Sequence, residues 1–426
     1  PLKEIRLAEP YYSVCRYIEE TLAKHGFEAW LVGGSVRDLL IQGKLSDLDY
    51  TTDALPEKVL KIFPRTVPVG IKFGTILVLY KGQKVEVTTY RADADYEDGR
   101  RPNKVEYAKD LATDIKRRDF TVNGLAYSVT RKELRDHCGG LEDLEKKTLR
   151  TIGDPIARFT EDGLRPIRGC RIAAKLGFSI EENTRKAMLA CVSVTAKVAP
   201  ERFYDEWRKT LRMKQKRAFW QNLLEAGIIG AFLPDIAVAF DKEHSAVLLR
   251  ELDALHLKSM AAYAASLFYL LGVRDKETAR RTMLDTKFPT AELKLALALL
   301  ETPLLKIQDQ PDRQTLKRHL AEVTRRDRGS HMRFFLDMGS STMRTKGFST
   351  EAIRAFRDSC SRHFVSILRS REPMDTTDLA VDGTDIQQLG IHGRAVGEVL
   401  ERLRMTVVAD AQANNRENLL RLAATN

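Results

Sequence analysis

Short apolar runs separated by glycines and polar stretches characterise the first third of the chain. Residues 28–32 form an apolar run that ends in two glycines, and residues 35–41 continue in a helical pattern. Residues 45–51 alternate between apolar and polar positions, which is typical of a half-buried strand. Residues 56–63 begin a helical pattern with a proline near its start. This order predicts a mixed α/β region at the beginning of the chain.

A β-hairpin and a charged loop follow. Residues 74–80 and 84–90 are strand-like runs joined by Lys81-Gly82-Gln83, which predicts a hairpin. The stretch 91–110 is charged and poor in apolar residues, so we expect a mobile loop there. From Asp119 onward the apolar positions recur with helical spacing and strand signals are few. The predicted fold class is α+β, with a small mixed α/β head followed by a long all-α body.

The composition excludes several classes of protein. Of the 426 residues, 43% are hydrophobic and 30% are charged, which is too apolar for a disordered chain and enough for several domains. No run of about 18 apolar residues occurs, so no transmembrane helix is expected. The first residues resemble neither a signal peptide nor a transit peptide. The five cysteines are scattered singly, without spacing for zinc or for a disulfide framework. A reduced, cytoplasmic protein is therefore expected.

The charge balance favours a polyanionic partner. Lys and Arg together number 70 against 59 Asp and Glu, and the formal net charge is +11. Many proteins without such a partner carry a similar charge, so this signal by itself is weak.

The first candidate for chemistry is a glycine turn. Gly33 and Gly34 follow the predicted strand and precede the predicted helix. Glycines there let the backbone approach a ligand, and the helix N-terminus offers free N–H groups to a phosphate. Arg37, on the first helical turn, can add a charge-assisted contact.

Three carboxylates form the second candidate. Asp47 and Asp49 are two residues apart on the predicted strand, so both side chains point to one face. Two carboxylates on one face repel each other, and a divalent cation such as Mg²⁺ resolves that repulsion. Glu86 lies between Val85 and Val87 and points away from both. Asp47, Asp49 and Glu86 are therefore predicted to hold two Mg²⁺ ions that support in-line nucleotidyl transfer.

Five ordered motifs resemble those of the class II CCA-adding enzymes, nucleotidyltransferases that build tRNA 3′ ends and are relatives of bacterial poly(A) polymerases. The matching segments are LVGGSVRDLL (31–40) with SDLDYTTDA (46–54), IKRRDFTVNGLAY (115–127), DHCGGLEDL (136–144), FTEDGLRPIRGCRIAAKLGF (159–178) and ERFYDEWRKTL (201–211). Five motifs in the family's order are much more specific than any one of them.

The resemblance implies a fold and an activity. The head would be a polymerase β-like nucleotidyltransferase domain that adds CCA to tRNA from CTP and ATP, without a nucleic acid template, and releases pyrophosphate. Arg118 would contact the nucleotide, and Asp119 and Asn123 would lie near its sugar. The expected parts are a catalytic head (1–135), a helical neck with the nucleobase-reading motif (136–212), a helical body (213–330) and a tRNA-binding tail (331–426).

The fourth motif is the expected place of nucleobase selection. By resemblance, Asp162 and Arg165 would accept cytosine and adenine and reject uracil and guanine. Arg168 and Arg171 continue the row of arginines at steps of three, and neighbours at that spacing share a helix face. Pro166 is uncomfortable inside a helix, so the helix is expected either to begin near Thr160 or to kink.

Related activities stay open on the sequence. The complete stretch 91–110 argues against addition of CC alone, because CC-adding relatives have this loop shortened. Residues 70–80 resemble the CCA-adding form more than the basic run of poly(A) polymerases. Addition of the terminal A alone is not separated from CCA addition, which is the prediction because it is the more common activity. A silent RNA-binding protein is disfavoured by the intact carboxylates. A sugar or antibiotic nucleotidyltransferase would lack the arginine row and the helical body.

The helical body is expected to bind RNA and not to catalyse. Residues 242–272 faintly resemble an HD phosphohydrolase, but apolar residues (268–271) stand where its metal ligands belong. No phosphohydrolase activity is predicted, and His244 and His256 are read as ordinary helix residues. The body helices are expected to contact the acceptor and TψC arms of tRNA through shape and phosphate contacts.

Overall fold

The structure of the chain, a computed structural model, divides into two compact units. Unit 1 comprises residues 1–238 with 285–287, and unit 2 comprises residues 239–284 with 288–426. The described residues are 4–45, 47–92, 106–240, 249–255, 257–273, 275–300, 311–323 and 325–425. Most of the predicted loop, His244 and His256 lie outside the described residues.

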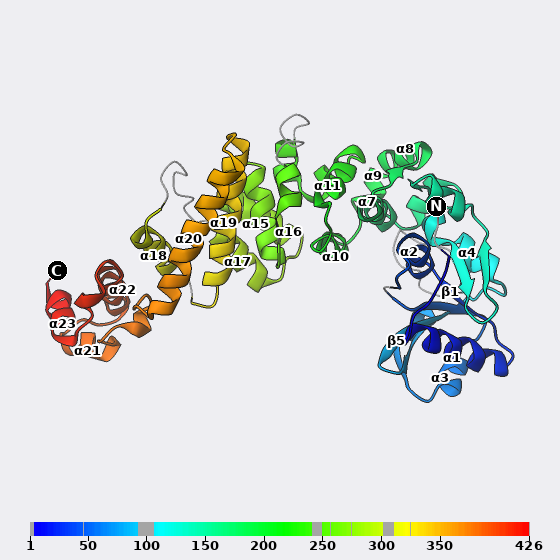
Figure 1. Cartoon of the computed structure of the whole chain (residues 1–426), viewed down its shortest axis with the longest axis horizontal. Helices are drawn as coiled ribbons and strands as arrows, with labels where there is room; N and C mark the ends of the chain where they lie inside the picture. The colour runs from blue at the N-terminus through cyan, green and yellow to red at the C-terminus, as the bar shows by residue number, and fades with distance from the viewer. Residues whose placement is uncertain are drawn as a thin grey trace. The chain divides into compact units, whose positions relative to one another are not determined.

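A sheet, drawn in blue and cyan in Figure 1, forms the core of unit 1. It has seven strands in the order β3-β4-β5-β2-β1-β6-β7. The strands are β1 (Ala29–Val32), β2 (Asp49–Thr52), β3 (Thr66–Gly70), β4 (Thr75–Tyr80), β5 (Gln83–Thr89), β6 (Leu125–Ser128) and β7 (Glu133–Asp136). Neighbouring strands are antiparallel except β2 and β5, which run parallel. This parallel pair lies in the interior of the sheet and positions the candidate carboxylates.

The predicted hairpin is confirmed, with a turn one residue shorter than expected. Tyr80 pairs with Gln83, so only Lys81 and Gly82 form the turn. Their φ angles are 46° and 73°. Two successive residues with positive φ give a turn whose twist matches that of the strands it joins. The strand after the turn alternates buried and exposed residues and so presents one polar face.

Helices pack on the sheet, and a buried carboxylate fastens one of them. They are α1 (Tyr11–Lys24), α2 (Gly34–Gln42), α3 (Pro56–Ile62) and α4 (Leu111–Lys116). Glu19 of α1 accepts hydrogen bonds from Tyr50 Oη on β2 at 3.0 Å and from Ser128 Oγ at 2.8 Å. It also accepts from the backbone amides of Val129 and Thr130, both at 2.9 Å. These donors offset the cost of burying the carboxylate.

The rest of unit 1 is mainly helical. Its elements are α5 (Gly140–Glu145), β8 (Thr148–Leu149), α6 (Pro155–Glu161), α7 (Leu164–Leu176), β9 (Ser179–Ile180), α8 (Glu182–Ala190), α9 (Val192–Thr195), α10 (Pro200–Lys209), α11 (Lys216–Glu225), α12 (Ile229–Phe232) and α13 (Pro234–Ala237). Ile172 and Ala173 of α7 belong to the same apolar core as the sheet. The helix with the arginine row is therefore packed directly on the head.

The fourth motif is broken into two helices, and both alternatives predicted for it were wrong. Helix α6 ends at Glu161 and α7 begins at Leu164. Pro166 therefore falls in the first turn of α7, where its missing N–H costs no hydrogen bond. A Cβ on Gly163 would lie 2.7 Å from the carbonyl oxygen of Val194. Close packing against α9 therefore requires glycine at the break.

Unit 2 is helical wherever the structure describes it as regular. Its helices are α15 (Met260–Leu270), α16 (Lys276–Asp285), α17 (Thr290–Leu300), α18 (Arg313–Ala321), α19 (Arg328–Thr345), α20 (Thr350–Ser370), α21 (Gly383–Gln388), α22 (Arg394–Ala409) and α23 (Arg416–Ala424). Short 3-10 helices occur in the chain at η1 (Ile71–Phe73), η2 (Thr121–Asn123), η3 (Val238–Phe240), η4 (Thr376–Asp378) and η5 (Ala411–Ala413). Two apolar clusters form, one around α18 to α20 and one around α21 to α23.

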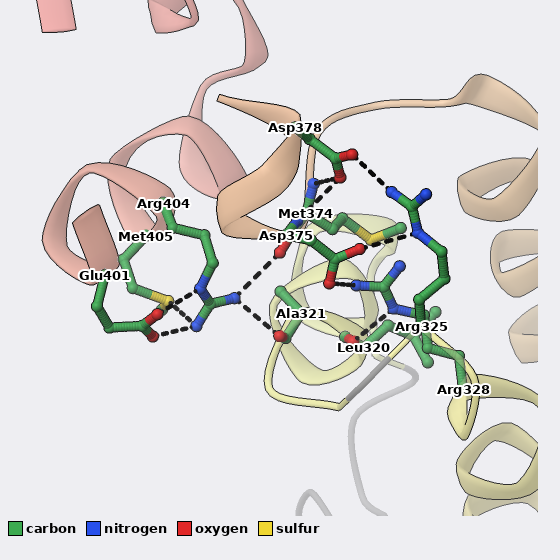
Figure 2. A network of polar contacts seen from close by, with 10 residues as sticks. All are labelled: Leu320, Ala321, Arg325, Arg328, Met374, Asp375, Asp378, Glu401, Arg404 and Met405. Atoms are coloured by element: carbon green, nitrogen blue, oxygen red, sulfur yellow. Dashed lines mark hydrogen bonds and ion pairs between the residues drawn. The ribbon is translucent and has the colours of Figure 1, made fainter. Parts of the chain in front are cut away.

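A network of arginines joins these two clusters (Figure 2). Arg328 donates to Asp375 at 2.6 Å and to the carbonyl of Leu320 at 3.1 Å. Arg404 of α22 donates to the carbonyls of Ala321 at 2.7 Å and Met374 at 3.2 Å. Side chains and backbone from α18, α19, η4 and α22 thus meet at one place, so the network holds the last helices against the preceding ones.

The α+β class is confirmed, and the internal details differ. The chain after Asp119 is mainly helical, as predicted, but two of the few strands described there, β6 and β7, complete one side of the sheet. They pair with β1 and with each other, and such long-range pairing leaves little trace in a short window of sequence. The patterns also did not predict α1 or β3. No described helix has the length and apolar character needed to cross a membrane.

Candidate functional site

Two carboxylates stand side by side on the parallel strands. Asp49 is the first residue of β2, and its register partner on β5 is Glu86. Partner residues on parallel strands point their side chains to the same face of the sheet. The backbone N–H of Glu86 donates to the carbonyl of Leu48 at 2.8 Å, which sets this register. The structure therefore brings these two predicted residues together.

Asp47 lies before the strand on which the alternation placed it. Strand β2 begins at Asp49, because β1 pairs with it only from Tyr50 to Thr52. The prediction that both aspartates occupy one strand was wrong. Ser35 Oγ, on the first turn of α2, donates to the carbonyl oxygen of Asp47 at 2.9 Å. This bond ties the exposed Asp47 to the glycine turn.

The carboxylates influence one another electrostatically. Burial raises the pKa of Asp49 to about 6, the charges of Glu86 and Asp47 act in the same direction, and Arg118 acts against them. Negative charge therefore exceeds positive charge around Asp49. Among the described residues no three Asp, Glu, His or Cys side chains are arranged to hold a metal ion by themselves. A cation at this place needs further oxygen ligands, such as those of a phosphate.

The glycine turn lies directly under an arginine. Gly33 has a φ of 72° and precedes α2, whose first turn has no side-chain cap. A Cβ on Gly33 would lie 3.3 Å from Nη1 of Arg118. Glycine therefore suits this position both for its backbone conformation and for the close approach. The turn exposes backbone amides next to a guanidinium, an arrangement that suits a phosphate.

A buried aspartate, Asp114, fixes the position of the Arg118 side chain. Its Nη2 donates to Asp114 at 3.0 Å, and Thr51 Oγ1 donates to the same carboxylate at 3.1 Å. Burial alone would raise the pKa of Asp114, but Arg118 and Arg117 outweigh it and keep the pKa at about 2. Within the described part of the chain, Nε of Arg118 is buried without a hydrogen-bond partner. The side chain as a whole is 21% exposed, so the guanidinium, held by Asp114, still presents N–H groups to an incoming anion.

A chain of buried polar groups runs behind the site. Arg37 donates to Asp38 at 2.7 Å and to Asn123 Oδ1 at 2.5 Å. Asn123 donates to Asp119 at 3.1 Å, and Arg168 donates to the other oxygen of Asp119 at 2.8 Å. Arg37 is therefore occupied by protein partners and does not extend freely from the first turn of α2. This series of hydrogen bonds connects α2 of the head to α7.

The arginine row pairs with three different carboxylates. Arg165 pairs with Glu161 at 2.8 Å, Arg168 with Asp119 at 2.8 Å and Arg171 with Glu206 at 2.5 Å. Burial alone would raise the pKa of Asp119, but Arg168 outweighs it and the pKa is about 2. The same ion pair raises the pKa of Arg168. These contacts hold each guanidinium in place.

The two residues expected to read the base belong to different local structures. Asp162 lies at the break between α6 and α7 and pairs with Arg202 of α10 at 3.2 Å. Arg165 is buried and donates to Glu161, to the carbonyl of Arg158 and to the carbonyl of Arg117 at the end of α4. Carbonyls at a helix C-terminus lack intrahelical partners, so Arg165 satisfies one of them. Both side chains are therefore held in place before any ligand binds.

Two cavities share this site. The smaller, of about 300 Å³, is lined by Gly33, Arg118, Asp119, Asp162 and Arg165 among others. The larger, of about 1010 Å³, is lined by Arg37, Asp47, Glu86 and Arg171 among others. Gly34, Asp49, Asn123 and Arg168 line both. Every residue proposed from the sequence for the site therefore lines at least one cavity.

Several residues of the site were not included in the sequence-based set. They are the supporting groups Asp114, Glu161, Arg202 and Glu206 and the cavity-lining lysines Lys175 and Lys209. The four-residue spacing of Glu161 and Arg165 was a usable signal, although the two residues lie on different helices, at the end of α6 and the start of α7. The other contacts join elements far apart in the chain and left no local pattern.

Family models match two parts of the chain. Residues 29–150 match the poly A polymerase head domain, and residues 177–240 match a domain described as a probable RNA and SrmB-binding site of polymerase A. The first range contains the sheet and its carboxylates. The second begins after α7.

Similar proteins and structures cover nearly the whole chain. The CCA-adding enzyme of Geobacillus sp. (strain WCH70) is 32% identical over 421 residues, which is 97% of this chain and 96% of that protein. The CCA-adding enzyme of Bacillus licheniformis is 32% identical over 404 residues, covering 93% and 94%. The crystal structure of the Bacillus stearothermophilus CCA-adding enzyme in complex with CTP is 27% identical, with a TM-score of 0.78 over 98% of this chain and 97% of that one.

Proposed function

The chain belongs to the family of CCA-adding enzymes, and from that premise we infer that it adds two cytidines and one adenosine to the 3′ end of tRNA. CTP and ATP are the substrates, and no nucleic acid template is used. The observation that carries this function is the pairing of Asp49 with Glu86 beside the glycine turn and Arg118. It places a carboxylate cluster next to a phosphate-binding turn.

The reaction joins the 3′ oxygen of the RNA to the α-phosphorus of the nucleotide and breaks the bond to the leaving pyrophosphate. Enzymes of this family use a divalent metal ion. We propose Mg²⁺, held by Asp47, Asp49 and Glu86 together with phosphate oxygens. Burial, and then the charges of Glu86 and Asp47, raise the pKa of Asp49, and a cation bound between these carboxylates relieves their repulsion. When bound, the ion activates the attacking oxygen and stabilises the leaving group.

The smaller cavity is the proposed nucleotide site. The amides after Gly33 and Gly34 and the guanidinium of Arg118 bind the triphosphate. Asp119 and Asn123 lie near the sugar, where the hydrogen bonds from Arg168 and Arg37 fix their orientation. These side chains therefore need little rearrangement when the nucleotide binds.

Base selection is proposed for Asp162 and Arg165. Cytosine and adenine both present an amino donor beside a ring-nitrogen acceptor, whereas uracil and guanine differ at these places. A carboxylate that accepts and a guanidinium that donates match the first pair. Glu161 holds Arg165 at 2.8 Å and Arg202 holds Asp162 at 3.2 Å, so both are presented as a fixed template. Arg168 and Arg171 support the same helix face.

The test separates the related activities. One tRNA is prepared with three ends, namely lacking CCA, ending in C and ending in CC. Each is incubated with Mg²⁺ and labelled CTP, ATP or both, and the products are sized on a gel. Growth of the bare end to CCA followed by arrest is the expected result. Addition of A to the CC end alone would make it an A-adding enzyme, a ladder of A a poly(A) polymerase, and no extension a silent RNA-binding protein.

The remaining parts of the chain keep proposed roles. We propose that the division into head, neck, body and tail at 135, 212 and 330 reflects function, with tRNA arms contacted by the helices after 213. A cytoplasmic location is proposed because tRNA is the substrate. The five cysteines are free thiols, which suits a reducing compartment.

A further inference from the structure

The larger cavity has more room and more positive charge than the nucleotide requires. Its volume is about 1010 Å³, against about 300 Å³ for the cavity with Asp162 and Arg165. The two cavities meet at Asp49, where the new bond must form. Given the proposed function, a second substrate has to reach Asp49 from the side that the nucleotide does not occupy.

We propose that the larger cavity receives the 3′-terminal nucleotides of the RNA, with Lys175 and Lys209 binding their backbone phosphates and Val69 contacting the terminal nucleoside. This inference rests on the proposed function and assigns residues that bind its RNA substrate. Lys175, Lys209 and Val69 are not among the residues that the five motifs are expected to use for nucleotide contacts.

The two lysines are second donors to carboxylates that already have an arginine. Asp38 accepts from Arg37 at 2.7 Å and from Lys175 at 3.2 Å. Glu206 accepts from Arg171 at 2.5 Å and from Lys209 at 2.6 Å. If either lysine turns to a phosphate, its carboxylate keeps the charge-assisted bond to the arginine. The cost of releasing each lysine is therefore small.

Exposure distinguishes the lysines from the arginines beside them. The side chains of Lys175 and Lys209 are 39% and 49% exposed, whereas that of Arg171 is 15% exposed. Lysine is a flexible point charge that suits phosphates along a moving strand, and a buried arginine is a rigid fork. The ion pair of Arg171 with Glu206 joins α7 to α10, and each of these helices contributes one of the two lysines to the cavity lining.

The cavity lining also includes apolar side chains. Val69 lies on the edge strand β3, lines the cavity and is 59% exposed. Leu77 of β4 lines the same cavity. An exposed valine gains nothing from solvent, and contact with a sugar or base removes its apolar surface from water. Cationic and apolar side chains that line one cavity together match a nucleotide chain.

The decisive experiment measures kinetics of the double variant Lys175→Gln/Lys209→Gln. The KM for tRNA lacking CCA should rise about tenfold, because two charge-assisted contacts are lost, while the KM values for CTP and ATP stay within twofold. The dependence of log KM for tRNA on log salt should become shallower by about 0.7 for each lysine. Lys186→Gln on α8, whose side chain is 69% exposed and does not line the cavity, is the matched control.

A second measurement uses the unmodified protein. A tRNA with uncharged methylphosphonate linkages at its last two internucleotide positions should have a KM raised as in the double variant. Combining both changes should add little, because they remove the same contacts. Additive effects would overturn the proposal. So would a rise in the KM for CTP and ATP with an unchanged KM for tRNA, since the lysines would then bind the triphosphate.

The role of Val69 is tested separately. Val69→Ser should raise the KM for tRNA about threefold by loss of apolar contact. Val67→Ser, at a 40% exposed position of the same strand that does not line the cavity, should have no effect. Equal effects of the two would overturn the role of Val69.

The experiments distinguish failure of the proposed function from failure of the assignment of the two lysines. If the unmodified protein extends no tRNA end, the proposed function fails. If it extends tRNA but tRNA affinity measured without nucleotide is the same for the unmodified protein and the double variant, only the assignment of the two lysines fails.

Discussion

Arginine–carboxylate pairs occur in both units and have different surroundings. In unit 1, Arg168 and Arg171 pair with carboxylates along the walls of a cavity. In unit 2, Arg328 and Arg404 are 4% and 8% exposed and donate partly to backbone carbonyls between helices (Figure 2). The same chemistry thus lines a site in one region and joins helices in the other. A buried ion pair by itself does not mark a functional site.

The direction of the pKa shift separates Asp49 from the carboxylates that ion pairs hold in either unit, such as Asp119 in unit 1 and Asp378 in unit 2. Burial and like charges raise the pKa of Asp49 to about 6. At Asp378 burial also acts to raise the pKa, but the amides of Met374 and Asp375 and then Arg325 outweigh it and lower the pKa. A buried carboxylate that its neighbours repel is suited to a cation, whereas a carboxylate whose partners lower its pKa belongs to a contact that is already satisfied.

The largest expected effect is at Asp49. Asp49→Asn should lower kcat by about a thousandfold or more, because several kcal/mol of transition-state stabilisation by the metal site is lost. The melting temperature should stay the same or rise slightly, since a repelled carboxylate becomes neutral. Primer extension and thermal unfolding measure the two quantities. Asp205→Asn, on α10 at a 52% exposed position, is the control, and retained turnover in Asp49→Asn would refute the metal assignment.

The matching test in unit 2 should affect stability alone. Arg404→Met leaves the carbonyls of Ala321 and Met374 without their donor, so the free energy of unfolding should fall by about 3 kcal/mol. Chemical denaturation measures it, and kcat of the folded protein should be unchanged. Arg394→Met, at a 95% exposed position of the same helix, should change stability by less than about 0.5 kcal/mol. Equal loss in both would show that the network contributes nothing.

Arg165 lines a cavity, like the other arginines of the unit 1 site, and donates to carbonyls, like the arginines of unit 2. A variant of Arg165 therefore tests which of these two roles it has. Like the arginines of unit 2 it is buried and donates to carbonyls, yet it lines the smaller cavity. Arg165→Ala should relax the preference for CTP over UTP by about 10- to 100-fold. Incorporation of each nucleotide on the same tRNA measures this ratio, with Arg185→Ala on α8 as control. Continued exclusion of UTP and GTP would contradict the template role.

The smallest expected effect depends on pH in unit 2. Burial lowers the pKa of His319 to about 4, below its ordinary value near 6.5. Below pH 6.5 the unfolded chain therefore binds a proton that the folded chain excludes, so stability falls as pH falls towards 4. Between pH 7.5 and 5.5 the expected loss is on the order of 1 kcal/mol.

His319→Phe should remove that part of the pH dependence. The ring lies 5.7 Å from that of Phe335, so an aromatic replacement keeps the packing. Denaturant titrations at both pH values measure the difference. An unchanged pH dependence in the variant would show that His319 is not the group responsible.

Local patterns determined much of this molecule. Glycines before a helix, two aspartates near a strand and a glycine within a short turn are short-range signals, and the hairpin, α2 and α3 follow from such signals, although the turn is one residue shorter than predicted. Every residue proposed from the sequence for the site lines at least one of the two cavities. The side-chain chemistry of these residues restricts what they can bind, and the sequence alone gives that chemistry.

Only the tertiary structure decided how these residues are used. Asp49 faces Glu86 because β2 and β5 pair in parallel across more than thirty intervening residues. The break at Gly163, which no periodicity revealed, follows from a contact with the backbone of Val194. Ion pairs such as Arg171 with Glu206 decide which cations are fixed and which lysines remain exposed. Such contacts depend on packing between segments that are distant in the sequence, so no local sequence pattern predicts them.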